Sequence, residues 1–239
     1  PDVAGDRLVW WRRWLIEDPR GWIEGGQPGS IRYTDDDLAD LRADQAAGRA
    51  RVVLFVGRFL GFKQVPMLLR AFAAAESRCA NRPHLVIWGG FPGEWEGVHP
   101  HTLAGRLGLR HVYFAGWRGH DDLPLGLSSA DVLAAPSRDE PFGQVYLEAM
   151  AAGLAVVGTS SGGPVDFVNT DPQQPEGWLV DPDDEAALTD ALVAAVDDDA
   201  ERARRGARGL ATVRRSYSWS AIAERWLDRY DEVVGADGP

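Results

Sequence analysis

Cysteine, long apolar runs and basic clusters are all scarce in this chain. The 239 residues include one cysteine, Cys79, so no disulfide can form within the chain and a reducing compartment, the cytoplasm, is expected. No apolar run reaches the roughly eighteen residues of a transmembrane helix, and Pro1-Asp2 does not begin a signal peptide. Since Pro1 is not an initiator Met either, we expect a fragment or a processed chain without a transmembrane segment.

Positive charge is also in short supply. Asp and Glu number 36 against 25 Lys and Arg, which gives a formal net charge of −11. This balance argues against nucleic acid and against an anionic membrane surface as the main partner. Hydrophobic residues make up 45% of the chain and charged residues 26%, as in ordinary globular proteins. The length suits one large α/β domain, or one domain with appendages.

Several cofactor and metal motifs are missing as well. No G-x-G-x-x-G follows an expected strand and no G-x-x-x-x-G-K-[ST] occurs, so nicotinamide, flavin and P-loop readings lack their phosphate cradle. The five histidines show no zinc-ligand set. Three Asp-x-Asp pairs stand before expected helices, where Asp is a preferred cap: Asp35/Asp37, Asp181/Asp183 and Asp197/Asp199. We therefore predict neither a bound metal nor a cofactor.

Short apolar runs alternate with helix-like segments along the chain. The expected strands are Val52–Val56, Leu85–Trp88, Val112–Ala115, Val132–Ala135, Ala155–Gly158 and Trp178–Val180. The expected helices are Val65–Cys79, Thr102–Leu107, Asp121–Ser129, Gln144–Ala152, Asp184–Val196, Ala200–Tyr217 and Ser220–Val234. This alternation predicts an α/β fold, a Rossmann-like parallel sheet with helices on both faces.

Two cations follow the first expected strand. Gly57 comes directly after the strand, Arg58 is next, and Lys63 lies on the loop before the following helix. Open α/β sheets bind ligands at the carboxyl ends of their strands. Arg offers phosphate a bidentate fork and Lys a point charge. The pair is therefore a candidate phosphate site, and the alternative is two solvated surface cations.

Two carboxylates flank the start of a later helix. Glu140 lies on a loop, because the proline and glycine that follow it do not suit a helix interior. Glu148 lies on the helix expected from Gln144, on the same face as Val145 and Ala149, which should point to the core. A carboxylate there needs a polar partner, and a ligand hydroxyl is a candidate. The alternative is an ordinary helix entry with one partly exposed Glu.

A glycine pair follows the strand Ala155–Gly158. Gly162 and Gly163 allow the backbone to approach a ligand closely and to point amides at it. Pro164 suits the first position of a helix. By themselves these residues fit a plain strand–helix turn equally well.

These segments, in this order, resemble the donor half of the retaining glycosyltransferases with the GT-B fold, specifically the large family four (glycosyl transferases group 1). The stretch from Glu140 to Glu148 is similar to the E-x7-E signature of that family. The resemblance implies that Glu140 contacts the donor sugar and that the backbone of Phe142, Gly143 and Gln144 contacts sugar hydroxyls. It also implies that Glu148 binds the ribose of the nucleotide.

The other segments carry further implied contacts. Gly57, Arg58 and Lys63 match a G-R-L-x-x-x-K pattern, in which the two cations hold the nucleotide diphosphate. The loop of Gly162 and Gly163 is implied to face the diphosphate and the sugar.

The nucleobase is implied to meet the loop after the strand Val112–Ala115. Trp117 and Arg118 lie on that loop and are base-pocket candidates. Because such recognition uses backbone groups, the choice among UDP, GDP and ADP cannot be read from the sequence. The loop Gly89–Gly93 follows another expected strand and could also border the nucleotide, but it is interpreted as an ordinary loop, and His120 as a surface or packing residue.

The resemblance covers roughly residues 51–234, one half of a GT-B enzyme. We expect a nucleotide-sugar-binding domain at 51–217 and a C-terminal helix at 218–239 that packs toward a missing N-terminal half. Residues 1–50 form a Trp-rich segment or linker containing Trp10, Trp11, Trp14 and Trp22. Local packing of this segment is favoured over a cover supplied by the missing half or by another subunit.

The resemblance implies retaining transfer of a hexose-type sugar from a nucleotide-diphosphate sugar to a hydroxyl acceptor. Arg58, Lys63 and Glu140 are the catalytic candidates, and the full-length protein is expected to be the active enzyme while the isolated chain is inactive. One alternative is a non-catalytic module that binds a nucleotide sugar. Another is an interaction module built around the Trp-rich segment.

Overall fold

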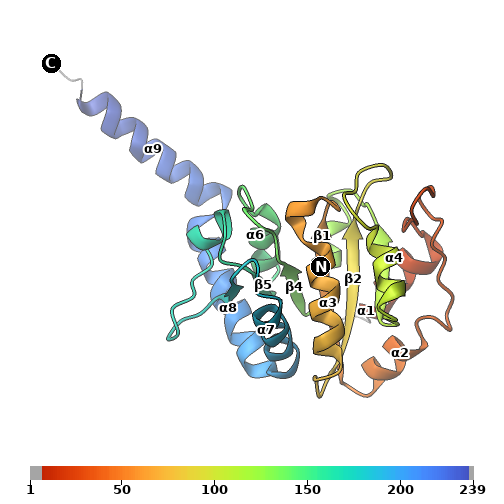
Figure 1. Cartoon of the computed structure of the whole chain (residues 1–239). Coiled ribbons are helices and arrows are strands. Elements are labelled where there is room, and N and C mark those ends of the chain that lie inside the picture. Colours follow the sequence, from red (N-terminus) through yellow and green to blue (C-terminus); the bar gives the residue numbers. More distant parts are fainter. Residues whose placement is uncertain (1–6, 237–239) are drawn as a thin grey trace.

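One parallel six-stranded sheet organises the molecule (Figure 1). The computed structural model describes residues 7–236, so the outermost residues of the expected segments 1–50 and 218–239 lie outside it. The strands are β1 Ala50–Gly57, β2 Arg82–Gly89, β3 Val112–Gly116, β4 Val132–Ala135, β5 Ala155–Thr159 and β6 Gly177–Val180. Their order across the sheet is β3-β2-β1-β4-β5-β6.

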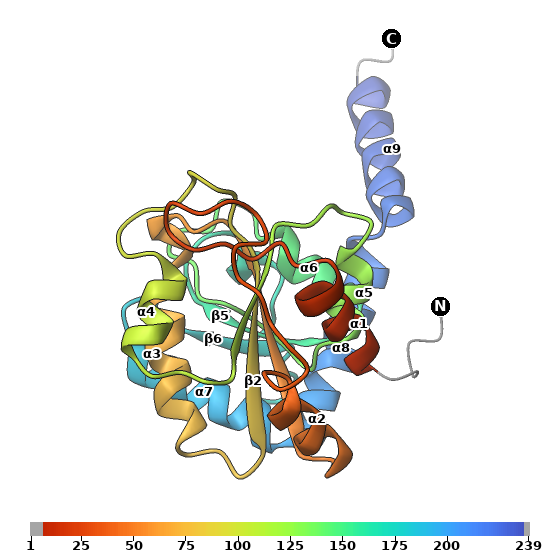
Figure 2. The same ribbon diagram turned by 90° about the vertical axis from the view of Figure 1, so that its right-hand side faces the viewer.

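Helices cover both faces of this sheet (Figure 2). The helices and helical turns are α1 Arg7–Arg12, the π-helical η1 Arg13–Glu17, α2 Ala39–Ala46, η2 Gly61–Lys63, α3 Val65–Glu76, α4 Pro100–Arg106, α5 Leu123–Ser128, α6 Gln144–Ala151, η3 Gly163–Asp166, α7 Glu185–Asp197, α8 Asp199–Ser216 and α9 Trp219–Ala236. In Figure 2, α3, α4 and α7 lie to the left of the sheet, and α1, α2, α5, α6 and α8 lie to its right.

The strands are apolar throughout because both of their faces are covered. Successive side chains of β1 point to opposite faces, so Val53 and Phe55 pack with α3 and α7, while Val52 and Leu54 pack on the other face with α2, α5 and α6. The result is two apolar layers, one on each side of a single sheet.

The Trp-rich segment contributes to both layers, with Trp22 in the first and Trp11 and Trp14 in the second. Trp11 and Trp14 are fully buried, and the Trp14 ring meets Trp88 of β2 edge-on at 4.8 Å between centroids. The Trp11 indole donates a hydrogen bond of 3.2 Å to the Ser129 carbonyl. Burial of each large aromatic ring stabilises the fold by roughly 2–3 kcal/mol. The described part of this segment therefore packs locally on the sheet.

The strand order reverses between β1 and β4. The chain runs from β1 outward to β3, then crosses back to β4 and continues outward to β6. Loops on the two sides of this point leave in opposite directions, which opens a crevice at the carboxyl ends of the strands. The loops after β1 and β4 carry Arg58, Lys63 and Glu140, so three candidate residues lie at the switch point.

Helix α9 extends away from the body of the molecule (Figure 1). Its exposed apolar side chains are Trp219, Trp226, Leu227, Tyr230, Val233 and Val234. Packing of this helix toward another domain stays a prediction. Along residues 7–236, no helix combines the length and the apolar character needed to cross a bilayer.

Every expected strand and helix is present, with ends that differ by a few residues. Two details of the sequence interpretation are wrong. The cap of α7 is Asp184, which follows the pair Asp181/Asp183 and accepts from the Ala187 amide. The cap of α8 is Asp198, which lies between Asp197 and Asp199 and accepts from the Glu201 amide. The buried face of α6 is formed by Tyr146, Ala149 and Met150.

Two glycines in helices are expected to respond in opposite ways to replacement by alanine. A Cβ at Gly206 of α8 would lie 2.2 Å from the Gly153 carbonyl oxygen, whereas a Cβ at Gly105 of α4 meets nothing within 4 Å. Gly206→Ala should lower the free energy of unfolding by about 2 kcal/mol or more, and Gly105→Ala should raise it by about 0.5 kcal/mol. Urea denaturation of both variants checks this, and a neutral Gly206→Ala would contradict the packing of α8 on that turn.

Acid should destabilise the fold through His99. Its ring is fully buried against Trp22, its Nδ1 accepts from the His101 amide at 3.2 Å, and burial lowers the pKa of His99 to about 4. The folded state therefore binds fewer protons than the unfolded state, so this stability is present above pH 6.5 and is lost as the pH falls toward 4. Between pH 7 and pH 5 we expect a loss of about 2 kcal/mol from this group.

Urea denaturation at both pH values, on the wild type and on His99→Gln, measures that loss. The glutamine does not titrate, so the variant should lose about 2 kcal/mol less between the two pH values. His84 acts in the same direction and His111 in the opposite one, and both are present in each protein, so the difference isolates His99. Equal pH dependence in the two proteins would show that His99 is not the group responsible.

Candidate functional site

A buried ion pair joins the loops on either side of the switch point. Lys63 ends the turn η2 after β1, and Glu140 lies on the loop after β4. The Lys63 Nζ lies 2.6 Å from Glu140 Oε2, and the two side chains are only 14% and 10% exposed. Removing one partner of such a pair leaves a buried charge uncompensated, so the pair holds the two loops in one arrangement.

The glycine loop after β5 packs against Glu140. Gly162 pairs with Glu140 as a short parallel bridge, and the Gly163 amide donates to the Glu140 carbonyl at 2.7 Å. Gly162 has a φ of +76°, and a Cβ there would lie 2.2 Å from that same carbonyl oxygen. Only glycine fits this position without strain. The loops after β1, β4 and β5 therefore converge on Glu140.

Helix α6 begins beside this junction. Gly143 precedes it with a φ of +87°, in the left-handed region that glycine adopts freely. The unpaired amides of the first turn of α6 therefore point toward the loop that carries Glu140. Phe142 is exposed, and the Gln144 side-chain amide donates to Glu148 Oε1 at 3.0 Å.

Glu148 differs from the expectation that it would face the core. It lies beside the buried face of α6, is half-buried, and borders a groove formed with α5 and a second groove formed with α8 and α9. Burial raises the pKa of Glu148, and the hydrogen bond from Gln144 and the nearby His120 partly offset that effect. The carboxylate is thus accessible to a ligand. It lies at the flank of the buried face because α6 is rotated by about one residue from the orientation that the sequence pattern predicted.

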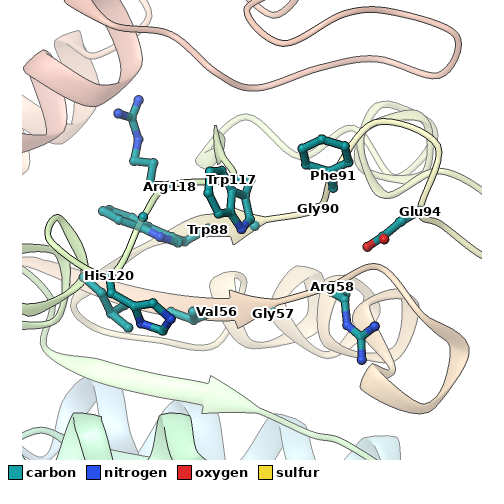
Figure 3. Close-up of a pocket in the computed structure, with 13 residues that line it drawn as sticks. Val56, Gly57, Arg58, Trp88, Gly90, Phe91, Glu94, Trp117, Arg118 and His120 are labelled. Carbon is teal, nitrogen blue, oxygen red and sulfur yellow. The ribbon is translucent and has the colours of Figure 1, made fainter.

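A cavity of about 490 Å³ opens at the carboxyl ends of β1, β2 and β3 (Figure 3). It is lined by Val56, Gly57, Arg58, Trp88, Gly89, Gly90, Phe91, Glu94, Trp117, Arg118, Gly119, His120 and Leu123. Arg58 is exposed and stands at the end of the cavity nearest the switch point. The walls combine aromatic rings with backbone groups of three loops, a composition suited to a small organic ligand.

The two base-pocket candidates point in different directions. Trp117 is exposed at the cavity, where its ring meets Phe91 edge-on at 6.3 Å between centroids. The Arg118 guanidinium is turned out of the cavity toward the amino-terminal segment (Figure 3), and only its backbone side borders the cavity. Its side chain is therefore not placed to touch a ligand there.

The predicted residues thus form three groups. Lys63, Glu140, Gly162 and Gly163 meet at the junction of loops, and Gly143 opens the helix beside them. Gly57, Arg58, Trp117 and Arg118 border the cavity, and Phe142, Gln144 and Glu148 border the groove between α6, α8 and α9.

The cavity is also lined by residues that were not candidates from the sequence, among them Trp88, Phe91, Glu94 and His120. Trp88 lies near the end of β2, and the others lie on loops that follow β2 or β3, so their position after a parallel strand was the available signal. Within the described part of the chain, no three His, Cys, Asp or Glu side chains come together as a metal site requires.

Known proteins are similar to this chain in sequence and in fold. The model of the family described as glycosyl transferases group 1 matches residues 50–198. A D-inositol 3-phosphate glycosyltransferase from Corynebacterium diphtheriae is 35% identical over 223 residues, covering 92% of this chain and 50% of the relative. The chain therefore spans about half the length of the curated relatives it matches.

Two solved structures show the same architecture. Sucrose-phosphate synthase from Thermosynechococcus elongatus is 30% identical with a TM-score of 0.66, covering 85% of this chain and 50% of that one. The Anabaena protein HepE, solved in complex with UDP-glucose, is 24% identical with a TM-score of 0.66, covering 84% and 54% respectively. The expected Rossmann-like half of a GT-B fold is confirmed, and the chain belongs to the glycosyl transferases group 1 family.

Proposed function

We propose that this chain is the donor-binding part of a glycosyltransferase and holds a nucleotide-diphosphate sugar at the switch point of its sheet. The observation that carries the proposal is the buried Lys63–Glu140 pair beside Arg58 and the cavity. It puts a cation for the diphosphate and a carboxylate for the sugar hydroxyls at one point. The complex of HepE with UDP-glucose supports a nucleotide sugar as the ligand class.

The diphosphate is assigned to Arg58 and Lys63. The Lys63 ammonium carries three donors, so it can keep Glu140 and also donate to a phosphate oxygen. Arg58 is exposed and can turn its fork toward the same group. When the bond between the diphosphate and the anomeric carbon breaks, negative charge grows on the leaving oxygen. Lys63, held in place by Glu140, and Arg58 stabilise that charge.

The sugar and the nucleoside take the two sides of that point. Glu140, the loop of Gly162 and Gly163 and the first turn of α6 lie on the sugar side, where they fix the anomeric carbon for attack. Glu148 accepts from the ribose hydroxyls, and the base enters the cavity beside Trp117.

We further propose that the full-length protein transfers a hexose-type sugar to a hydroxyl acceptor with retention of anomeric configuration. In this reaction the acceptor oxygen replaces the diphosphate at the anomeric carbon. We assign the acceptor site to the second half of the enzyme. The curated relatives are about twice as long and are named glycosyltransferases, which supports this division. With its single cysteine the chain suits the reducing cytoplasm.

Nucleotide binding by this chain tests the proposal. In calorimetric titrations with UDP, GDP, ADP and TDP, one nucleotide should bind saturably, and Arg58→Met should weaken it by about 10- to 100-fold because charge-assisted hydrogen bonds are lost. Arg70→Met is the matched control, since Arg70 is an exposed arginine of α3 that pairs with Glu185 at 2.7 Å. If the folded wild type bound none of the four, or both variants weakened equally, the diphosphate assignment would be wrong.

Lys63 needs a different design because its removal leaves Glu140 buried and unpaired. The double variant Lys63→Met with Glu140→Gln removes both charges and keeps similar volumes, which limits the loss of stability. It should bind the diphosphate about tenfold or more weakly than wild type. Unchanged affinity in a variant with a native circular dichroism spectrum would exclude Lys63 as a diphosphate ligand.

Nucleotide affinity should fall at a pH where an ordinary glutamate is still ionised. The pKa of Glu148 is raised by burial, so this carboxylate takes up a proton earlier than usual as the pH falls, and a protonated carboxyl accepts fewer hydrogen bonds from ribose. Titrations of one nucleotide from pH 7.5 down to about 5 should show the decline. Glu148→Gln should bind more weakly at neutral pH and show a smaller decline, because only the protonation of the nucleotide's own terminal phosphate remains. An equal decline in the variant would assign the effect to another group.

A further inference from the structure

The amino-terminal segment contacts each of the three loops that border the cavity. After β3, Arg20 forms a parallel bridge with Gly116. After β2, the Trp22 indole donates to the Gly90 carbonyl at 3.1 Å. After β1, the Trp22 ring stacks on Phe59 with 6.0 Å between centroids. A single stretch of chain therefore lies behind the whole nucleoside side of the cavity.

The space between this stretch and the loops is too small to allow sliding. Gly116 has a φ of +72°, and a Cβ there would lie 2.1 Å from the Arg20 carbonyl oxygen. A Cβ at Gly90 would lie 2.3 Å from the Phe59 ring, which also stacks with Trp22. Close packing of this kind transmits a displacement of the segment to the loops.

Arg118 makes the strongest of these connections. One of its terminal nitrogens donates to the Trp14 carbonyl at 2.7 Å and to the Asp18 carbonyl, and the other lies 3.0 Å from Asp18 Oδ2. The guanidinium also lies over the Trp88 ring, 5.9 Å from its centroid. The side chain is fully buried, and Asp122 Oδ2 lies 4.0 Å away.

A buried guanidinium is costly unless its partners stay in place. Its three acceptors at Trp14 and Asp18 lie on the amino-terminal segment, while its backbone borders the cavity between Trp117 and Gly119. The backbone of this loop can move only by pulling the guanidinium off those acceptors. The Arg118 side chain, which points away from the cavity, thus restrains the backbone that borders the cavity.

We propose that Arg118 is a positioning residue for the nucleoside part of the ligand. By clamping the loop Trp117–His120 to Trp14 and Asp18, it presets the backbone groups against which the base binds, without touching the ligand through its side chain. This inference rests on the proposed function. It gives Trp14 and Asp18 of the amino-terminal segment a part in positioning the nucleoside, and it leaves the diphosphate to Arg58 and Lys63.

Separate binding measurements on parts of the ligand test the inference. The probes are whichever of UDP, GDP, ADP and TDP binds the wild-type chain most tightly, the matching nucleoside monophosphate, and inorganic pyrophosphate. Arg118→Met should weaken the diphosphate and the monophosphate by about tenfold, because a misplaced loop loses hydrogen bonds to the base. Pyrophosphate affinity should stay within about twofold of wild type, and Arg118→Lys should recover part of the loss.

Two variants serve as matched controls. Arg205→Met removes another largely buried arginine, which lies over the Trp178 ring at 3.9 Å and donates to the Gly177 carbonyl at the opposite edge of the sheet. It should change no affinity. If Arg118→Met does not fold, Asp18→Asn carries the test with an expected loss of about threefold. Asp35→Asn, in the same segment but paired with Arg12 at 3.1 Å, is its control.

The outcomes separate the two proposals. A folded Arg118→Met chain that binds all three probes like wild type overturns the positioning role and leaves the donor site intact. Equal weakening of pyrophosphate and monophosphate also overturns it, because that pattern marks a general structural role. A wild-type chain that binds no nucleotide removes the proposed function, and the inference with it.

Discussion

The ion pair between Lys63 and Glu140 is the interaction on which the candidate site depends. It spans the point where the strand order of the sheet reverses, and in doing so it ties the loop after β1 to the loop after β4. Because both side chains are nearly buried, neither charge is screened by water, and each is held by the other. The glycine loop after β5 then packs on the Glu140 backbone, so the pair sets the positions of three loops. The ion pair therefore presents a cation and a carboxylate to a ligand at a fixed separation.

The sheet itself is stabilised from both faces, and this shapes the rest of the site. On one face α3 and α7 cover the strands. On the other face the strands are covered by α6, α8 and Trp11 and Trp14 of the amino-terminal segment. That segment is therefore more than a connection to another part of the protein. Trp14 packs on Trp88, which lines the cavity, and Arg118 reaches back from the cavity wall to the same segment. The part of the cavity that we propose for the nucleoside is thus built on a segment that precedes the sheet in sequence.

The sequence predicted the strands and the loop motifs well for a simple reason. Buried parallel strands are continuously apolar, and glycine or proline marks their ends, so both signals are local. The same local logic was wrong for α6, where the pattern favoured Val145 as core-facing and the structure buries Tyr146 and Met150 instead. Tyr146 hydrogen-bonds the Ala135 carbonyl and fills the space left by Gly158, and that contact between distant segments decides the rotation of the helix. No periodicity within α6 contains that information.

By itself, the sequence determined the α/β class, the order of the elements and the residues available at the carboxyl ends of the strands. Each of these follows from spacing along one chain, since strand, loop and helix signals are short-range. The tertiary structure alone decided which of those residues meet. It paired Lys63 with Glu140 across 77 residues, placed Phe91 against Trp117, and turned Arg118 away from the cavity. Such pairings arise from packing between elements that are far apart in sequence, where burial and the pairing of buried charge govern each side chain.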